Sequence, residues 1–505
     1  MNFKTCSTAL AVALLTATAM PAYAQKAQNT VRFAYDQVPE NIDPFFNNVR
    51  IGVIIGQHVW DTLVFRDPAT GEYKPNLATS WEWIDDRTLE MELREDVTFH
   101  NGDAFSADDV VFTLNYVANP DNRSVTQQNV NWIENVEKLG DYKVRITTTK
   151  TFPAAIEYLS GPVVIHPGKY YEEVGPQGMN TAAVGSGPFK VVSHDVGRQL
   201  VLERNEDYWN ENKQVPNIER LIIRFIPDRQ TQAAELMSDG LDFIMNVPVD
   251  QAEQMGMMPN INVKSGETMR IVFLQMNSLD NTPAEPLKNE KVRQAINHAI
   301  DRQTMVEQLV GEGARVIDVI CFPAQFGCSD EEATKYEYDP EKARALLEEA
   351  GYGNGFSLDI YAYRERQQTE AMVNYLREVG IDANLRFMQY AAFRDANRAG
   401  EVAMSHQTWG SFSINDVSAN TPVFYKFEAD DVNRDEEVRD LLQTGDTSVA
   451  ADERAEAYKK ALGLISQRAY AVPMYSLTSY YATADGLEFQ PYPDEIPRFW
   501  EMEWK

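Results

Sequence analysis

The stretch from Arg270 to Gln308 begins RIVFLQMN and, after a polar loop, continues NEKVRQAINHAIDRQTMVEQ. The short apolar run predicts a buried strand over 271–276. Asn289 stands where an N-cap would stand, and apolar residues recur behind it at helical spacing, which indicates an amphipathic helix. We therefore expect a strand, a loop and a helix that begin a second structural unit, with Asn277 close to a cleft between two lobes.

Length and charge bound the class of protein. The chain has 505 residues, and single cores stop growing near about 250–300 residues, so two or more domains are expected. The formal net charge is −30, which argues against nucleic acid and against an anionic membrane surface as partners. The acidic residues are dispersed, as on an ordinary solvated surface.

The first 24 residues have the pattern of a secretory signal peptide. Lys4 supplies a positive charge, an apolar run covers 9–19, and Ala22-Tyr-Ala24 offers an A-x-A cleavage site. The apolar run is too short to span a bilayer. We expect cleavage after Ala24 and a periplasmic mature protein.

Two cysteines remain in the mature chain, Cys321 and Cys328. In an oxidising compartment, cysteines this close are most simply a disulfide. The alternative is a metal site, which would need further Cys or His ligands at suitable spacing. The six histidines are scattered singly, so we expect neither a metal site nor a cofactor.

Strands and helices alternate along the chain. After Trp209 the pattern is βαβ-like, which predicts a mixed α/β lobe. Ser106 with Asp109 resembles a capping box, and Asp339 before a proline predicts another helix start. Further strands are expected at 31–35, 89–93, 218–226, 358–362, 381–388 and 471–475, and further helices at 369–379 and 454–468.

A family resemblance rests on four motifs that occur in order. They are LATSWE with LREDVTFHNGD near 77–103, GSGPFK at 185–190, NEDYW at 205–209 and VRQAINHAID at 292–301. Together they resemble the signature of bacterial extracellular solute-binding proteins of family 5, the peptide-, nickel- and opine-binding receptors of ABC importers. From the residues themselves, we expect Gly185 and Gly187 to allow a positive φ or close backbone packing. Arg293 and Asp301 are expected on the helix surface or in salt bridges.

The resemblance implies an α/β fold of two lobes with mixed sheets and two hinge crossings, the large, dipeptide-binding-like (cluster C) type. The first lobe is expected to comprise 25–270 with 472–505, including an extra subdomain at about 57–184, and the second to comprise 271–471. A monomeric receptor of this kind would close on its solute and deliver it to a membrane ABC permease and its ATPase. A peptide or peptide-like solute is the first expectation, and an opine, sugar conjugate or metal complex is the alternative. No catalytic motif is present, and the resemblance makes a secreted carboxylate-dependent hydrolase the less favoured alternative.

Loops that follow predicted strands supply the candidate ligand-binding residues. Trp409 matches the tryptophan of the loop G-W-x-x-D in peptide-binding relatives, but Phe412 occupies the position of its aspartate. The next carboxylate is Asp416, so recognition of a free amine is in doubt. The full candidate set is Trp409, Phe412, Asp416, Tyr363, Arg364, Arg366, Asn277, Phe46 and Asn47.

Overall fold

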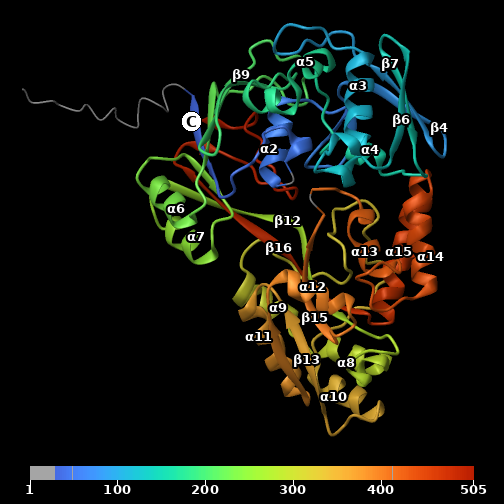
Figure 1. Cartoon of the computed structure of the whole chain (residues 1–505). Coiled ribbons are helices and arrows are strands. Elements are labelled where there is room, and N and C mark those ends of the chain that lie inside the picture. The colour runs from blue at the N-terminus through green and yellow to red at the C-terminus, as the bar shows by residue number, and fades with distance from the viewer. Residues whose placement is uncertain (1–28, 48, 412) are drawn as a thin grey trace, which may run out of the picture.

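Within the part of the chain that the structure describes, one mixed sheet of ten strands extends from one end of the molecule to the other. The computed structural model describes residues 29–47, 49–411 and 413–505. The strand order is β14-β13-β15-β12-β16-β11-β1-β10-β9-β8. Figure 1 shows the early strands in the upper body and the later strands in the lower body, with β12 and β16 running from one to the other. The molecule is therefore a two-lobed α/β protein with mixed strands and two crossings.

The two crossing strands are β12 (Ile261–Met276) and β16 (Ala471–Ala484). They pair antiparallel along most of their length, and their register is interrupted between Glu267 and Ile271. Before the interruption β16 lies between β12 and β11, and after it β12 lies between β16 and β15. A bulge of this kind bends a strand pair locally. The predicted strand over 271–276 is confirmed, although β12 begins ten residues earlier.

The first lobe holds strands from the beginning of the chain and from the region before β12. The predicted strands at 31–35 and 218–226 are confirmed. The elements are β1 (Thr30–Tyr35), α2 (Arg50–Val59), β8 (Phe189–Asp195), β9 (Gln199–Arg204), β10 (Arg220–Phe225), α6 (Arg229–Met237), β11 (Phe243–Met245) and α7 (Val249–Gly256).

A separate four-stranded sheet, in the order β4-β5-β7-β6, forms a subdomain on this lobe. The predicted capping box is confirmed, because the Ser106 hydroxyl accepts from the first turn and Asp109 bonds back to the Ser106 amide. The elements are β2 (Val64–Arg66), β3 (Tyr73–Pro75), β4 (Ala78–Asp85), β5 (Thr88–Leu93), α3 (Ala107–Ala118), β6 (Ile133–Gly140), β7 (Lys143–Thr148), α4 (Ala155–Tyr158) and α5 (Gly168–Thr181).

The second lobe places helices around three sheet strands. The predicted N-caps Asn289 and Asp339 are confirmed, since each side chain accepts a hydrogen bond from the helix it precedes. The elements are α8 (Glu290–Ala299), α9 (Arg302–Met305), α10 (Pro340–Glu349), β13 (Phe356–Ala362), α11 (Arg366–Glu378), β14 (Ile381–Phe387), α12 (Tyr390–Arg398), β15 (Met404–Gly410), α13 (Thr421–Tyr425), α14 (Glu436–Thr447) and α15 (Ala451–Gln467).

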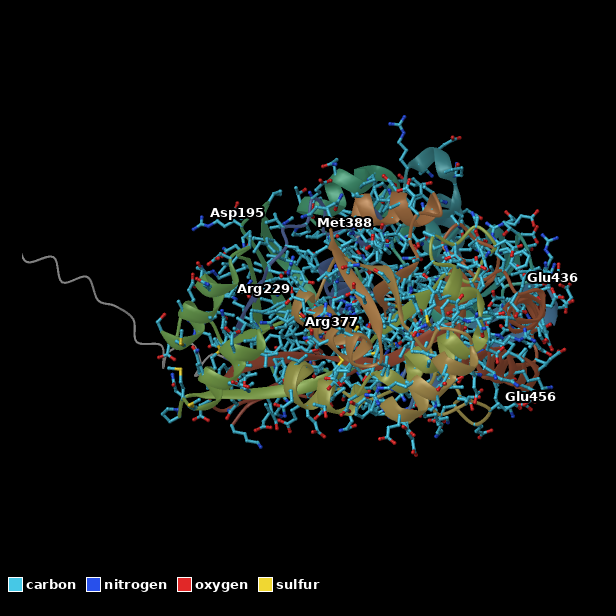
Figure 2. All side chains as sticks on the ribbon, turned by 90° about the horizontal axis from the view of Figure 1, so that it is seen from below. Asp195, Arg229, Arg377, Met388, Glu436 and Glu456 are labelled. Atoms are coloured by element: carbon cyan, nitrogen blue, oxygen red, sulfur yellow. A yellow bond between two sulfur atoms is a disulfide. The ribbon has the colours of Figure 1, made fainter. Side chains whose placement is uncertain are left out.

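The two lobes have separate hydrophobic cores. The largest cluster draws only on residues 31–245 and 481–502, whereas two other clusters draw on residues 269–475. The chain end belongs to the first lobe, where Phe499 and Trp500 pack against His58. Figure 2 shows charged side chains such as Glu436 and Glu456 at the molecular surface. Of the residues that the structure describes, no helix is long and apolar enough to cross a membrane.

The glycine motif at 185–187 serves backbone packing rather than a positive φ. A Cβ added to Gly185 would overlap the carbonyl oxygen of Val59, and one added to Gly187 would lie 2.6 Å from the carbonyl oxygen of His58. Neither glycine is among the positive-φ residues. The two glycines therefore let this turn lie directly against the end of α2.

The surface position predicted for Arg293 is wrong. Its side chain is buried, and its guanidinium donates to the carbonyl oxygens of Leu287, Lys288 and Arg468. These carbonyls stand at helix ends, Leu287 and Lys288 at the end of a 3-10 helix and Arg468 at the C-cap of α15, where carbonyl groups lack a partner within the helix. Five N–H donors in one guanidinium can satisfy several of them at once. Asp301, in contrast, is a partly exposed N-cap that accepts from the Thr304 amide.

Candidate ligand site between the lobes

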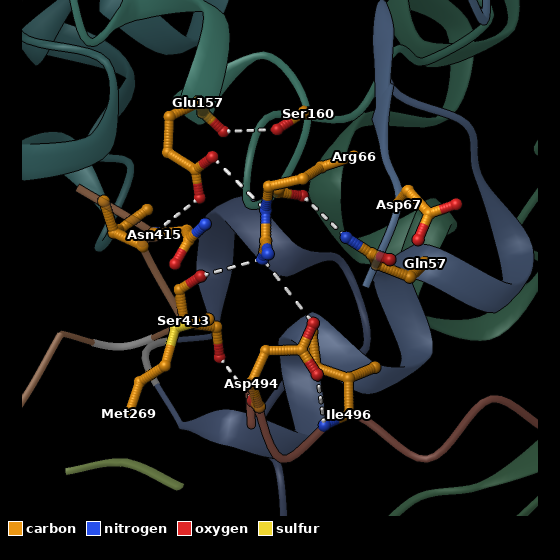
Figure 3. Close-up of polar contacts among 12 residues, drawn as sticks. Gln57, Arg66, Asp67, Glu157, Ser160, Met269, Ser413, Asn415, Asp494 and Ile496 are labelled. Carbon is orange, nitrogen blue, oxygen red and sulfur yellow. Dashed lines mark hydrogen bonds and ion pairs between the residues drawn. The ribbon is translucent and has the colours of Figure 1, made fainter. Parts of the chain in front are cut away.

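The loop after β15 brings the second lobe against the first. The backbone N–H of Asn415 donates to Glu157 Oε1 at 2.7 Å, and Arg66 donates to the Ser413 carbonyl oxygen at 3.2 Å. The Arg50 guanidinium donates to Ser413 Oγ at 2.7 Å. We call the group shown in part in Figure 3 the interlobe network; its members are Arg50, Arg66, Glu157, Ser413, Asn415 and Asp494.

Buried charges hold the interlobe network together. Arg66 lies between Glu157 at 3.2 Å and Asp494 at 3.5 Å, and all three side chains are buried. Burial raises the pKa of the Glu157 carboxyl, while the Arg66 charge and the Asn415 N–H oppose that rise. Tyr73 also donates to Glu157, at 2.8 Å. Because every oxygen of Glu157 is engaged, the carboxylate fixes the position of the second-lobe loop.

A disulfide braces the same loop from the second-lobe side. Cys321 and Cys328 are bonded, with their Cα atoms 5.8 Å apart. Between them, Gln325 Nε2 donates to the Ile414 carbonyl oxygen at 3.0 Å, and the Phe326 N–H donates to the Asn415 carbonyl oxygen at 3.0 Å. The disulfide loop and the interlobe network therefore both form hydrogen bonds with the segment 413–415, the first from the second lobe and the second from the first lobe.

Trp409 lies at the end of β15, directly before this loop. It is half-buried, its ring meets Phe424 edge-on at 5.3 Å, and its indole N–H donates to the Ala419 carbonyl oxygen at 3.3 Å. The indole thus has an internal partner and keeps part of its ring surface accessible. Phe412, another candidate, lies outside the described residues.

Asp416 is buried and bonded within the second lobe. Both of its carboxylate oxygens accept from Arg454, at 3.0 and 2.8 Å, and one accepts from the Ser418 amide. Its side chain is 2% exposed. Since the negative charge is already paired with a buried cation, the structure gives this carboxylate a role in holding the loop.

The loop after β13 carries three candidates that differ in their surroundings. The Tyr363 hydroxyl donates to the Thr408 carbonyl oxygen at 3.1 Å, beside the end of β15. Arg364 is exposed and lies within electrostatic range of Arg270. Arg366 is exposed on the first turn of α11 and pairs with Glu370 at 2.8 Å. Tyr363 and Arg364 are therefore near Trp409 in the fold.

The remaining candidates, Asn277, Asn47 and Phe46, make hydrogen bonds or packing contacts within their own lobe. Asn277 is buried, donates to the Val402 carbonyl oxygen at 3.1 Å, and lies seven residues beyond Arg270, or roughly 23 Å along the strand. Asn47 is buried and donates to the Asn41 carbonyl oxygen at 2.8 Å. Phe46 is partly buried and packs against the first-lobe core. Asn277 therefore lies far from the interlobe contacts, whereas Asn47 shapes a first-lobe turn.

One residue that the sequence-based candidates omit is Arg270, opposite Gly410 on β15. Its guanidinium lies over the glycine, because a Cβ there would be 3.1 Å from Arg270 Cζ. It is half-buried, and burial lowers its pKa, while Glu495 opposes this and Arg50 and Arg364 reinforce it. The sequence signal that could have identified Arg270 is its position as a charged residue directly before the apolar run 271–276.

The sequence of this chain is similar to those of known proteins. The family model for bacterial extracellular solute-binding proteins, family 5 Middle, matches residues 72–431. Heme-binding protein A of Haemophilus influenzae is 26% identical over 453 residues, which is 83% of this chain and 81% of that protein. Glutathione-binding protein GsiB of Escherichia coli K12 is 28% identical over 402 residues, 77% of this chain and 75% of that protein.

Solved structures extend the likeness to nearly the whole chain. HbpA2 from Haemophilus parasuis has a TM-score of 0.84 at 26% identity and covers 94% of this chain and 100% of its own. The unliganded open form of the periplasmic murein tripeptide-binding protein MppA has a TM-score of 0.83 at 17% identity, covering 94% of this chain and 97% of its own. The second comparison establishes the shared fold.

Proposed function

The chain belongs to the bacterial extracellular solute-binding proteins of family 5, and we propose that it is the periplasmic receptor that captures a peptide or peptide-like solute for an ABC importer. After export and cleavage behind Ala24, the monomer would close its lobes on the solute and present it to the membrane permease, whose ATPase drives uptake. The family is one of solute binders, not enzymes.

The observation that carries this proposal is the path of β12 and β16. β12 leads from a first-lobe hydrophobic cluster at Ile261 to the second-lobe core at Val272. β16 leads from that core at Val472 back to the first-lobe core at Tyr481. The register of the two strands breaks between Glu267 and Ile271, between these cores. We propose this break as the hinge. On β12 it adjoins the boundary expected at 270/271, and on β16 it faces the stretch from Ser476 to Thr478, a few residues beyond the boundary expected at 471/472. Hinge closure around a ligand is the usual motion of two lobes joined in this way.

The proposed solute lies against the segment where β13 and β15 end. Trp409 and Tyr363 supply aromatic surface, and Arg270 and Arg364 supply charge. Aromatic walls with a few placed polar groups are typical of small-molecule sites. In this proposal Asp416, Asn277 and Asn47 each support the backbone of their own segment, because their polar atoms already have partners in the fold.

The test is direct binding by protein prepared from the periplasm. Calorimetry and native mass spectrometry with a mixed tripeptide library and with glutathione should show 1:1 complexes in which the peptide is released unchanged. Small-angle scattering should show a smaller radius of gyration at saturation. The proposal would be contradicted if the protein converted a peptide chemically. It would also be contradicted if the protein bound neither glutathione nor any peptide of the library.

A further inference from the structure

Arginine side chains gather at the end of β15, although the chain as a whole is strongly acidic. Arg50 and Arg364 both act electrostatically on Arg270. The carboxylate that acts most on Arg270 is Glu495, and it already pairs with Arg50 at 3.0 Å. The protein has a formal net charge of −30, so a group of three arginines around the end of β15 contrasts with the acidic chain as a whole.

Arg270 itself has no acceptor among residues 29–47, 49–411 and 413–505: none of them forms a hydrogen bond or an ion pair with its guanidinium. The guanidinium is half-buried against Gly410, so it has lost part of its hydration. A desolvated cation without a partner is costly, and a bound anion would remove that cost. Arg302 and Arg293, on the second lobe, are instead bonded to several carbonyl oxygens.

The buried carboxylates of the same segment are already paired, so they do not offer their charge to a cationic solute. Asp416 is the nearest downstream carboxylate to Trp409, and Arg454 already binds both of its oxygens. Glu157 likewise accepts from Asn415 and Tyr73 and forms an ion pair with Arg66. Both carboxylates have all their oxygens engaged inside the fold, so neither is available to balance the charge of Arg270.

We infer that the solute carries a carboxylate and that Arg270 binds this group, with Arg364 approaching it from the exposed side. This inference rests on the proposed function and adds the chemical class of the solute. A planar guanidinium matches a carboxylate with two parallel N–H donors, and partial burial strengthens the pair. A solute whose acid group is converted to a neutral amide would leave Arg270 without its partner.

The experiment uses two forms of one mixed tripeptide library, with a free C-terminal carboxylate and with a C-terminal amide. Binding to the full mature protein is measured by calorimetry for the wild type, Arg270→Gln and Arg364→Gln. Arg386→Gln is the matched control, because Arg386 is an exposed arginine paired with Asp359 elsewhere on the second lobe. Thermal unfolding of each variant shows whether it is folded, and exposed Arg364 gives a second variant that does not disturb packing.

We expect the free-acid library to bind the wild type and the control equally. Arg270→Gln should weaken that binding at least tenfold, Arg364→Gln severalfold, and neither should weaken binding of the amide library further. Equal wild-type affinity for both libraries, or equal losses for both in Arg270→Gln, would overturn the inference while leaving peptide capture intact. Binding of neither library by the wild type would overturn the inference together with the proposed function.

Discussion

Glu157→Gln tests whether the interlobe network holds the loop that follows β15. In the wild type, the Asn415 N–H donates to a fully buried carboxylate that also pairs with Arg66. The substitution keeps the shape and an acceptor oxygen but removes the negative charge. Asp494 remains 3.5 Å from Arg66, so the arginine is not left without a counter-charge.

The expected magnitude follows from the change in one hydrogen bond. Bonds to charged groups contribute about 1.5–3 kcal/mol net, and neutral ones about 0.5–1.5 kcal/mol. The contact between Asn415 and residue 157 should therefore lose about 1–2 kcal/mol. If the loop opens locally before its amides exchange, this loss speeds exchange at Asn415 by about 5- to 30-fold.

Hydrogen–deuterium exchange with fragmentation of the peptide covering 410–417 measures this directly. Tyr73→Phe is the control, because Tyr73 donates from the first lobe to Oε2 of the same carboxylate, whereas the Asn415 N–H donates to Oε1. It should leave exchange at Asn415 within about threefold of the wild type, because the hydrogen bond that it removes goes to the other carboxylate oxygen and the charge of Glu157 is kept. Unchanged exchange in Glu157→Gln, or equal acceleration in both variants, would refute the role given to the Glu157 charge.

Three further predictions concern stability. Burial lowers the pKa of His58 from 6.5 to about 3, so between these pH values only the unfolded chain binds a proton at this residue. The unfolding free energy therefore keeps the full contribution of His58 above pH 6.5 and loses about 2 kcal/mol of it at pH 5. The unfolding free energy of His58→Gln should depend less on pH between 6.5 and 5. Replacing Cys321 and Cys328 with serine should lower the unfolding free energy by about 2–3 kcal/mol, and two free thiols in unreduced periplasmic protein would count against the disulfide. Gly185→Ala should cost about 3 kcal/mol or more because its Cβ overlaps backbone, whereas Gly256→Ala, with nothing within 4 Å, should be nearly neutral by chemical unfolding.

Local signals in the sequence predicted much of the fold. The capping box at Ser106, the N-caps Asn289 and Asp339 and the apolar run at 271–276 each depend on neighbouring residues, and each is confirmed. The first part of β12 was missed because it is polar and partly exposed, with Lys264 among its residues. Its strand conformation comes from pairing with β16, more than 200 residues away, which no local pattern reports.

The candidate site was harder to predict from the sequence, because a charged side chain binds a ligand or pairs inside the protein depending on its burial, and local sequence patterns do not report burial of charged residues. Asp416 and Arg454 are 38 positions apart and become partners only in the folded lobe. Arg66 and Glu157 look like ordinary surface charges in an acidic chain, yet both side chains are buried in the interlobe network. Trp409 and Arg364 could be proposed from their positions after strands, since strand ends gather at one edge of a sheet.

The position of Arg270 links the proposed solute to the proposed hinge. It stands between Glu267 and Ile271, where the register of the two crossing strands is interrupted. The charges that act on it come from both lobes: Arg50 and Glu495 lie on the first, and Arg364 lies on the second. A carboxylate bound to Arg270 would therefore interact with the first lobe more strongly when the lobes close around it, and that difference in interaction energy is what a ligand needs to shift a two-state equilibrium toward closure.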